Sequence, residues 1–164
     1  MAANEPKQRF GESSKFERVT EHTIERLVDE FYRKVRLDPA LAPIFARAIA
    51  SDDWGPHLAV MRNFWSSVML TSGRYKGNPV AKHLKLEGIE PPLFDHWLGL
   101  FAQTCRELFI DEVANEFVVK AQRIAESLKL ALFYRPDQPW PRSLSDGVVG
   151  KFERYLPEKV GHGD

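Results

Sequence analysis

The side chains of this sequence best suited to bind a metal are its five histidines, because a neutral imidazole is the commonest metal ligand in proteins. They are His22, His57, His83, His96 and His162. We expect His22, off the apolar side of a helix, and His162, in the terminal tail, to face solvent. His96 precedes Trp97, and adjacent helical side chains point about 100° apart. If Trp97 faces the core, His96 faces solvent, which leaves His57 and His83.

Each of these two histidines has an ordinary interpretation beside a functional one. His57 lies on the apolar side of its expected helix, one turn before Met61, where a satisfied core or boundary histidine is common. His83 lies in a short segment between Pro79 and Gly88, where it can be a plain loop residue or a ligand. Neither position decides the matter by itself.

Other kinds of chemistry find less support in the sequence. His83 and Glu87 are spaced one helical turn apart, as ligands are in di-iron helical bundles, but such a site needs further ligands on facing helices, and the remaining histidines are too scattered. The sequence has no glycine-rich phosphate loop, no Cys-x-x-Cys pair and no Gly-x-Ser-x-Gly motif. Cys105 falls on the apolar side of a helix, and we interpret it as a small core residue.

The composition is that of an ordinary globular domain, with 43% hydrophobic and 28% charged residues in 164. The net charge is zero and the signs are mixed along the chain, which argues against nucleic acid as the main partner. The single cysteine excludes an intrachain disulfide and suits the cytoplasm. The polar start of the chain does not resemble a signal peptide, and no stretch is apolar enough to predict a membrane span.

The pattern of apolar residues predicts only helices. Thr20 is a suitable N-cap for a first long helix with an apolar stripe, which Asp38-Pro39 stops. A short helix follows over Leu41–Ile49, and Ser51, Asp52 and Asp53 offer caps for the next helix. The later segments are a loop at 71–79, a short piece at Val80–Leu86, a helix that starts at Pro91-Pro92, and a last helix that Asp111 and Glu112 open.

These elements predict one all-α domain with loosely attached ends. We expect a flexible N-terminal arm at residues 1–17, a helical domain at 18–134, and a tail at 135–164 that is rich in proline and glycine. Phe152, Tyr155 and Leu156 in the tail could form one docked helical turn.

Between residues 20 and 134, several short motifs in order resemble the truncated haemoglobins, the two-over-two globins, and most closely their third group. The motifs are Glu30-Phe31-Tyr32-Arg33-Lys34-Val35-Arg36, Asp38-Pro39, Pro43-Ile44-Phe45, Trp54-x-x-His57, Asn63-Phe64-Trp65, Gly73-x-Tyr75-x-Gly77-x-Pro79-x-x-x-His83-Leu84 and Phe94-x-x-Trp97-Leu98-x-Leu100-Phe101. The resemblance implies a helical sandwich, two helices over two, around haem b.

The resemblance also implies a role for each matched residue. His83 would be the proximal iron ligand, as is usual in globins. Tyr32 and Trp97 would be distal hydrogen-bond donors to the bound ligand, and His57 would take the distal histidine position, as a gate or as a direct donor. An apolar slot for the macrocycle would be lined by Phe31, Phe45, Met61, Phe94 and Trp97.

One position departs from the family pattern. Where the family often has a basic residue that meets a haem propionate, one turn after the distal histidine, this chain has Val60. Arg62, Arg74 or Lys82 could take that part.

The function implied by the resemblance is reversible binding of O2, NO or another small diatomic ligand. Redox chemistry is a further expectation, either nitric oxide dioxygenation or use of peroxide, with a reductase as a partner. Two distal donors would make a poor oxygen carrier and a good holder of the ligand. The alternatives left open are a non-enzymatic sensor or store and a helical interaction module without haem.

Overall fold

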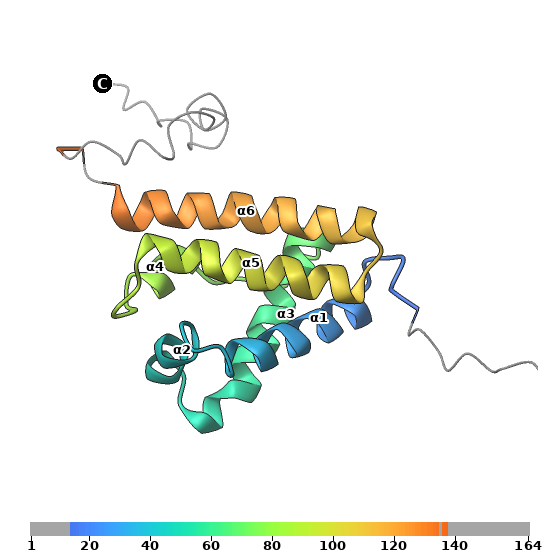
Figure 1. Ribbon diagram of the computed structural model, residues 1–164, viewed down its shortest axis with the longest axis horizontal. Helices are drawn as coiled ribbons and strands as arrows, with labels where there is room; N and C mark the ends of the chain where they lie inside the picture. Colours follow the sequence, from blue (N-terminus) through green and yellow to red (C-terminus); the bar gives the residue numbers. More distant parts are fainter. Residues whose placement is uncertain (1–13, 135, 138–164) are drawn as a thin grey trace, which may run out of the picture. The chain divides into compact units, whose positions relative to one another are not determined.

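The computed structural model describes residues 14–134, 136 and 137, and over this range the secondary structure is helical. The elements in order are α1 (Glu21–Val35), α2 (Ala42–Ala48), the 3-10 turn η1 (Ser51–Asp53), α3 (Trp54–Leu70), α4 (Pro79–His83), α5 (Pro91–Leu108) and α6 (Asp111–Phe133). Figure 1 shows α5 and α6 side by side, and an ion pair between Asp95 and Lys129 at 3.5 Å joins them. Helix α1 packs against both α3 and α5. The predicted all-α class is confirmed.

The first helix begins where the sequence predicts. The Thr20 hydroxyl accepts the Thr23 N–H at 3.1 Å, and the Thr23 hydroxyl accepts the Thr20 N–H at 2.8 Å. This reciprocal pair satisfies two backbone donors that the start of a helix would leave without partners. The predicted apolar stripe is buried along its whole length, from Ile24 to Val35. The helix is therefore fixed both at its end and along one side.

The connection from α1 to α2 is organised by Asp38. One oxygen of its carboxylate accepts the backbone N–H groups of Ala40 at 2.9 Å and Leu41 at 3.0 Å. These contacts turn the chain immediately after the Asp38-Pro39 stop and lead it into α2. Both the stop and the short helix agree with the prediction.

The start of α3 differs from the prediction in one respect. Ser51, Asp52 and Asp53, expected as side-chain caps, form η1 instead, and Asp53 makes no capping hydrogen bond. A 3-10 turn at a helix start gives backbone acceptors to N–H groups that a side-chain cap would otherwise serve, as where the Asp53 N–H donates to Ala50 O at 2.9 Å. At its other end α3 stops at Thr71, which has a left-handed backbone with φ 54°.

Of the three later helices, α5 and α6 start at the predicted residues. Helix α4 starts at Pro79, one residue before the predicted Val80, and ends at His83, three residues before the predicted Leu86. Pro79 opens α4, which Asn78 caps through the Ala81 N–H at 3.1 Å, and Pro91 opens α5. Proline suits the first turn because its missing N–H would have no partner there. The acidic start of α6 at Asp111 also agrees with the prediction.

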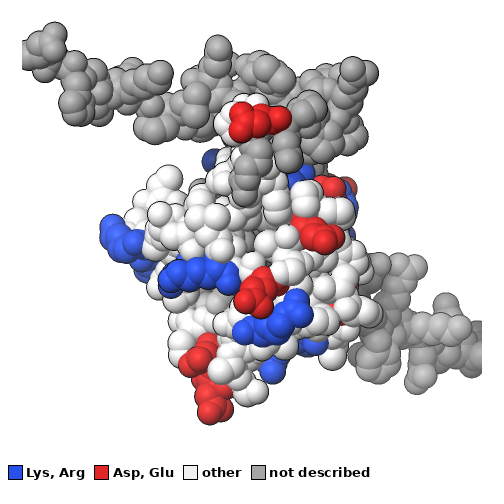
Figure 2. Space-filling view, turned by 90° about the vertical axis from the view of Figure 1, so that its left-hand side faces the viewer, with Lys and Arg blue, Asp and Glu red and all other residues white. Residues whose placement is uncertain are grey.

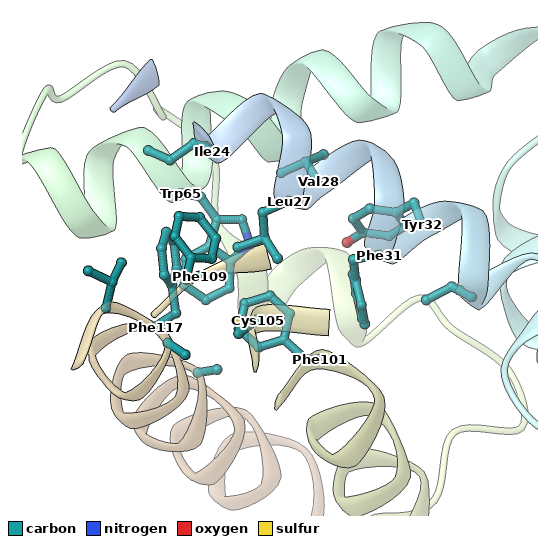
Figure 3. Packing of buried hydrophobic residues seen from close by; sticks show 14 of the residues in the cluster. Ile24, Leu27, Val28, Phe31, Tyr32, Trp65, Phe101, Cys105, Phe109 and Phe117 are labelled. Carbon is teal, nitrogen blue, oxygen red and sulfur yellow. The ribbon is translucent and has the colours of Figure 1, made fainter. Parts of the chain in front are cut away.

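The core joins α1, α3, α5 and α6 through large aromatic side chains. The Phe101 ring stacks with Trp65 at 4.8 Å and with Trp97 at 5.2 Å between ring centroids, with interplanar angles of 14° and 5°. Phe109 and Phe117 are also fully buried, and Figure 3 shows these rings facing Ile24 and Leu27 of α1. Aromatic stacking adds about 0.5–1.5 kcal/mol per pair to the free energy of burial.

The two predicted ends can be judged only where the structure describes them. Most of the expected arm, and almost all of the tail with its proposed turn at Phe152, Tyr155 and Leu156, lie outside the described residues. Phe16, which we expected in the arm, instead pairs with Phe109 as an isolated parallel bridge, with its N–H donating to Leu108 O at 2.8 Å. No described helix is both long and apolar enough to cross a membrane.

Replacing Thr20 with alanine should lower the free energy of unfolding by about 1 kcal/mol, because the Thr23 N–H loses its acceptor. Chemical denaturation followed by circular dichroism measures this change. Thr20→Ser keeps the hydroxyl and serves as the control. Equal stability of the alanine and serine variants would show that the cap does not stabilise α1.

Candidate functional site

One large cavity lies among the helices of the domain. Its volume is about 820 Å³, within the range of about 300–1,000 Å³ that is typical of small-molecule and cofactor sites. All six α-helices contribute to its wall, and the lining is mostly apolar. Four of the five residues predicted to line the haem slot border this cavity, namely Phe45, Met61, Phe94 and Trp97.

Tyr32 places a hydroxyl on the wall of this cavity. The residue is 4% exposed, and its ring meets the His57 ring edge-on at 5.2 Å. Burial raises the pKa of Tyr32, because the charged phenolate would lose its hydration. The hydroxyl therefore keeps its proton, and it has no hydrogen-bond partner among the described residues. It is available as a donor to a ligand in the cavity.

Trp97 contributes a second donor group from α5. Its indole stacks with Phe101 on one side of the core and borders the cavity. Phe31 meets Tyr32 at 5.1 Å and Trp97 at 5.2 Å, both edge-on. Phe31, which we predicted to line the cavity, does not border it and packs behind both donors. Its function in the structure is to fix their orientation.

His57 completes this group of polar side chains from α3. The Trp54 ring meets it edge-on at 5.7 Å. Its Nε2 is buried and has no hydrogen-bond partner among the described residues, and burial lowers the pKa of the imidazole. A buried polar atom without a partner is costly in free energy, so this nitrogen favours a ligand or solvent molecule that can bond to it.

His83 lines the same cavity from the last residue of α4. Its Nδ1 lies 2.7 Å from the carbonyl oxygen of Pro79, one helical turn earlier. A carbonyl only accepts, so Nδ1 carries the proton and Nε2 keeps a free lone pair. This is the tautomer that a metal needs, and the backbone bond also fixes the direction of the ring. The Phe94 ring lies 6.4 Å away, tilted by 31°.

The loop between α3 and α4 covers part of the cavity and is held by hydroxyl groups. The Tyr75 N–H donates to Ser67 Oγ at 2.8 Å, and the Tyr75 ring meets Phe64 edge-on at 5.2 Å. At Gly77 a Cβ atom would lie 2.4 Å from the Tyr75 hydroxyl, so no side chain fits there while Tyr75 keeps this position. Any other residue at this position would therefore force the Tyr75 side chain to shift.

Basic side chains surround the cavity in a pattern that differs from the prediction. Five of them belong to its lining, namely Arg47, Arg74, Lys76, Lys82 and Lys85. Arg62, a predicted propionate partner, is not among them, because it pairs with Asp29 at 2.7 Å and Glu25 at 3.4 Å. Sequence reasoning missed Arg47, Lys76 and Lys85, since no motif marks which exposed cations a fold brings to one opening.

Three of the remaining polar candidates lie where we expected them. His22 and His96 are exposed, and Cys105 is fully buried; burial raises the pKa of the Cys105 thiol to about 12. His162 lies outside the described residues. No group of three or more His, Cys, Asp or Glu side chains in the described part of the chain could hold a metal ion, so the di-iron alternative at His83 and Glu87 finds no further ligands.

His96 also has a structural partner. Its Nε2 lies 2.8 Å from the second carboxylate oxygen of Asp38. Burial pushes the pKa of Asp38 upward, but hydrogen bonds from His96 and from the backbone of Leu41 and Ala40 outweigh it, and the pKa lies below its ordinary value. This pair links the α1–α2 connection to α5, one residue before Trp97.

The cavity fits the haem that the resemblance implies. It offers a large apolar space for the macrocycle, an imidazole nitrogen with a free lone pair, and cations for the two propionates. The buried His57 Nε2 and the free Tyr32 hydroxyl would stay without hydrogen-bond partners if the cavity held a purely apolar molecule. The donor set therefore suits a metal-centred, carboxylate-bearing planar group.

Comparison with known proteins gives one curated relative and one solved structure. The sequence is 37% identical over 121 residues to a group 3 truncated hemoglobin of Campylobacter jejuni subsp. jejuni serotype O:2, which covers 73% of this chain and 95% of the relative. The crystal structure of a group III truncated hemoglobin from Campylobacter jejuni matches with a TM-score of 0.70 and 36% identity, over 73% of this chain and 96% of that chain. No model of a protein family matches the sequence.

The low pKa of Asp38 gives stability that depends on pH. In the unfolded chain the Asp38 carboxyl has its ordinary pKa near 3.8, so as the pH falls it takes up a proton there before it does so in the folded protein. The stability that comes from this difference is complete well above pH 3.8 and is lost as the pH falls through the folded pKa. Between pH ~5 and ~3, wild-type protein should therefore lose more free energy of unfolding than Asp38→Asn. Urea unfolding at each pH measures this, with Asp52→Asn, which removes an exposed carboxylate, as the control. Parallel curves for wild type and Asp38→Asn would contradict the prediction.

Proposed function

The chain belongs to the group 3 truncated haemoglobins, and is thus a haem globin that binds small diatomic ligands; from this premise we propose that His83 ligates haem b and that Tyr32, Trp97 and His57 hold the ligand. The observation that carries the proposal is the position of His83, whose free Nε2 shares one cavity with these three polar side chains. The alternative of a helical module without haem is dropped.

When bound, haem supplies an iron centre that takes up a diatomic ligand and shifts electron density onto it. The chain's own contribution begins at His83. The Pro79 carbonyl, bonded to Nδ1, keeps the imidazole in the tautomer that presents Nε2, and it makes that nitrogen more basic. The cations Arg74 and Lys82, both in the cavity lining, would meet the propionates in place of the family's basic residue at position 60.

The distal side chains would act as fixed hydrogen-bond donors. Burial keeps the Tyr32 hydroxyl protonated, and an indole N–H such as that of Trp97 is only a donor. Donors that are already in place stabilise negative charge without having to reorganise. A hydrogen bond to a charged acceptor contributes about 1.5–3 kcal/mol. Two such bonds favour a protein that retains its ligand over one that delivers it.

His57 would act differently from the two donors. Its lowered pKa keeps the imidazole neutral near pH 7, and a neutral imidazole can donate from one nitrogen and accept at the other. The ring lies between Trp54 and Tyr32, with edge-on contacts to both. From this position it could bond the ligand directly or swing aside to admit it.

Two kinds of activity are consistent with a pocket that retains its ligand. Nitric oxide dioxygenation or a peroxidase-like reaction, each with a reductase as partner, would make the protein an enzyme, whereas simple retention would make it a sensor or store. Continuous turnover of nitric oxide with a reductant, against a single stoichiometric reaction, separates these alternatives. We propose the cytoplasm as its location, since its one thiol is free and buried.

Replacing His83 with glycine should abolish the intense haem absorption band of the purified protein, or make it depend on added imidazole, because Nε2 is the proposed iron ligand. Absorption spectra in the ferric and ferrous forms measure this. His22→Gly removes an exposed histidine outside the cavity and is the control. An unchanged spectrum of His83→Gly would refute the ligand assignment.

Tyr32→Phe and Trp97→Phe should each speed oxygen dissociation by roughly ten- to a hundredfold, the rate equivalent of one lost hydrogen bond to a charged acceptor. Stopped-flow displacement of oxygen measures the rate. Tyr75→Phe removes a different hydroxyl from the cavity lining and should change the rate far less. If neither distal substitution speeds dissociation, the two side chains are not donors.

A further inference from the structure

The opening of the cavity carries a concentration of positive charge. Five lysine and arginine side chains belong to the lining and no carboxylate does, in a chain with 23 basic and 23 acidic residues. The five come from α2, from the loop after α3, and from α4 and the segment that follows it, and all are exposed. Together they form a basic rim, defined here as Arg47, Arg74, Lys76, Lys82 and Lys85.

The rim has more positive charge than its proposed cofactor can use. Haem b carries two propionates, for which Arg74 and Lys82 suffice. Arg74 is also paired with Glu21 at 3.4 Å. The other three rim residues, Arg47, Lys76 and Lys85, form no salt bridge with any described residue. One acidic residue, Glu87, lines an adjoining small hollow together with Arg47 and Lys85, but it forms no salt bridge with either of them. A surplus of unpaired cations therefore remains in solvent.

The neutral chain must balance this rim with acidic residues elsewhere. Figure 2 views the molecule from the side on which α2 and α4 lie, and lysine and arginine side chains cross the middle of that face, with acidic ones beside them. A local excess of one sign on a neutral protein orients an oppositely charged partner as it approaches. Such steering raises the rate of association more than the final affinity.

Apolar side chains are exposed next to the rim. Val60, which borders the cavity, is 48% exposed, and Leu84, directly after His83, is 62% exposed. Protein interfaces commonly have an apolar centre within a polar margin. Small, transient interfaces of this kind are typical of electron-transfer partners.

From these observations we propose that the basic rim docks the acidic surface of a one-electron donor protein, such as a flavoprotein or an iron–sulfur protein. The proposal rests on the function proposed above, because the donor would dock beside the cavity that would hold the haem. In the transfer, an anionic flavin hydroquinone or a reduced iron–sulfur centre would lose one electron and ferric haem would gain it, and no covalent bond would form or break. A membrane with anionic lipids is the competing partner for such a surface.

The test uses the haem-loaded chain and an acidic flavodoxin as the probe. In Lys76→Glu/Lys85→Glu, two rim residues that we do not assign to the propionates reverse their charge. In Lys120→Glu/Arg123→Glu, two exposed residues of α6 outside the lining undergo the same change, so both variants have the same net charge. Absorption spectra first establish that each variant keeps its haem, which tests the proposed function separately.

Association rates are then measured by surface plasmon resonance at about 20 mM and about 200 mM salt, which span strong and weak screening. We expect the rim variant to associate at least roughly tenfold more slowly than wild type at low salt, the control variant to change much less, and wild type to slow steeply with salt. Equal slowing of both variants, or no binding of flavodoxin at low salt, would overturn the proposal. Binding to phosphatidylglycerol vesicles without binding to flavodoxin would overturn it in favour of the membrane.

Discussion

The stack of Trp65, Phe101 and Trp97 is the contact on which the rest of the structure depends. It holds α3 against α5, and both of its outer rings, Trp65 and Trp97, border the cavity. Phe31 of α1 packs edge-on against the same rings, which orients Tyr32 beside it. A single aromatic cluster thus closes the core and also presents two hydrogen-bond donors to the open space.

An empty cavity lowers the stability of the fold, and a bound cofactor would offset this loss. An apolar cavity forfeits the packing contacts that a filled core would make, and this loss grows with its volume. A cofactor that fills the cavity and binds only the folded chain stabilises the fold in proportion to the logarithm of its concentration over its dissociation constant. Structurally, haem in such a globin completes the hydrophobic core as well as supplying the iron.

Residues that act locally were predictable from the sequence, and residues that act through distant contacts were not. Thr20, Pro91 and Asp111 mark helix starts because caps and prolines act within one turn. His83 could be interpreted as an iron ligand only from the order of the motifs around it. Arg62 and Phe31 were misplaced because their partners, Asp29 on one helix and Trp97 on another, are far away in sequence. The surplus cations of the rim carry no local signal at all.

The length of α4 has a consequence for how the protein is assembled. Its five residues make little more than one helical turn, and so short a segment does not stay helical in water without support. Asn78 and the packing of its neighbours supply that support, and a bond from iron to His83 would add to it. Uptake of the cofactor is then partly a folding reaction. Helix α4, which carries the proposed iron ligand His83, would be the last turn to become ordered. Its fraying would then set how fast the cofactor dissociates.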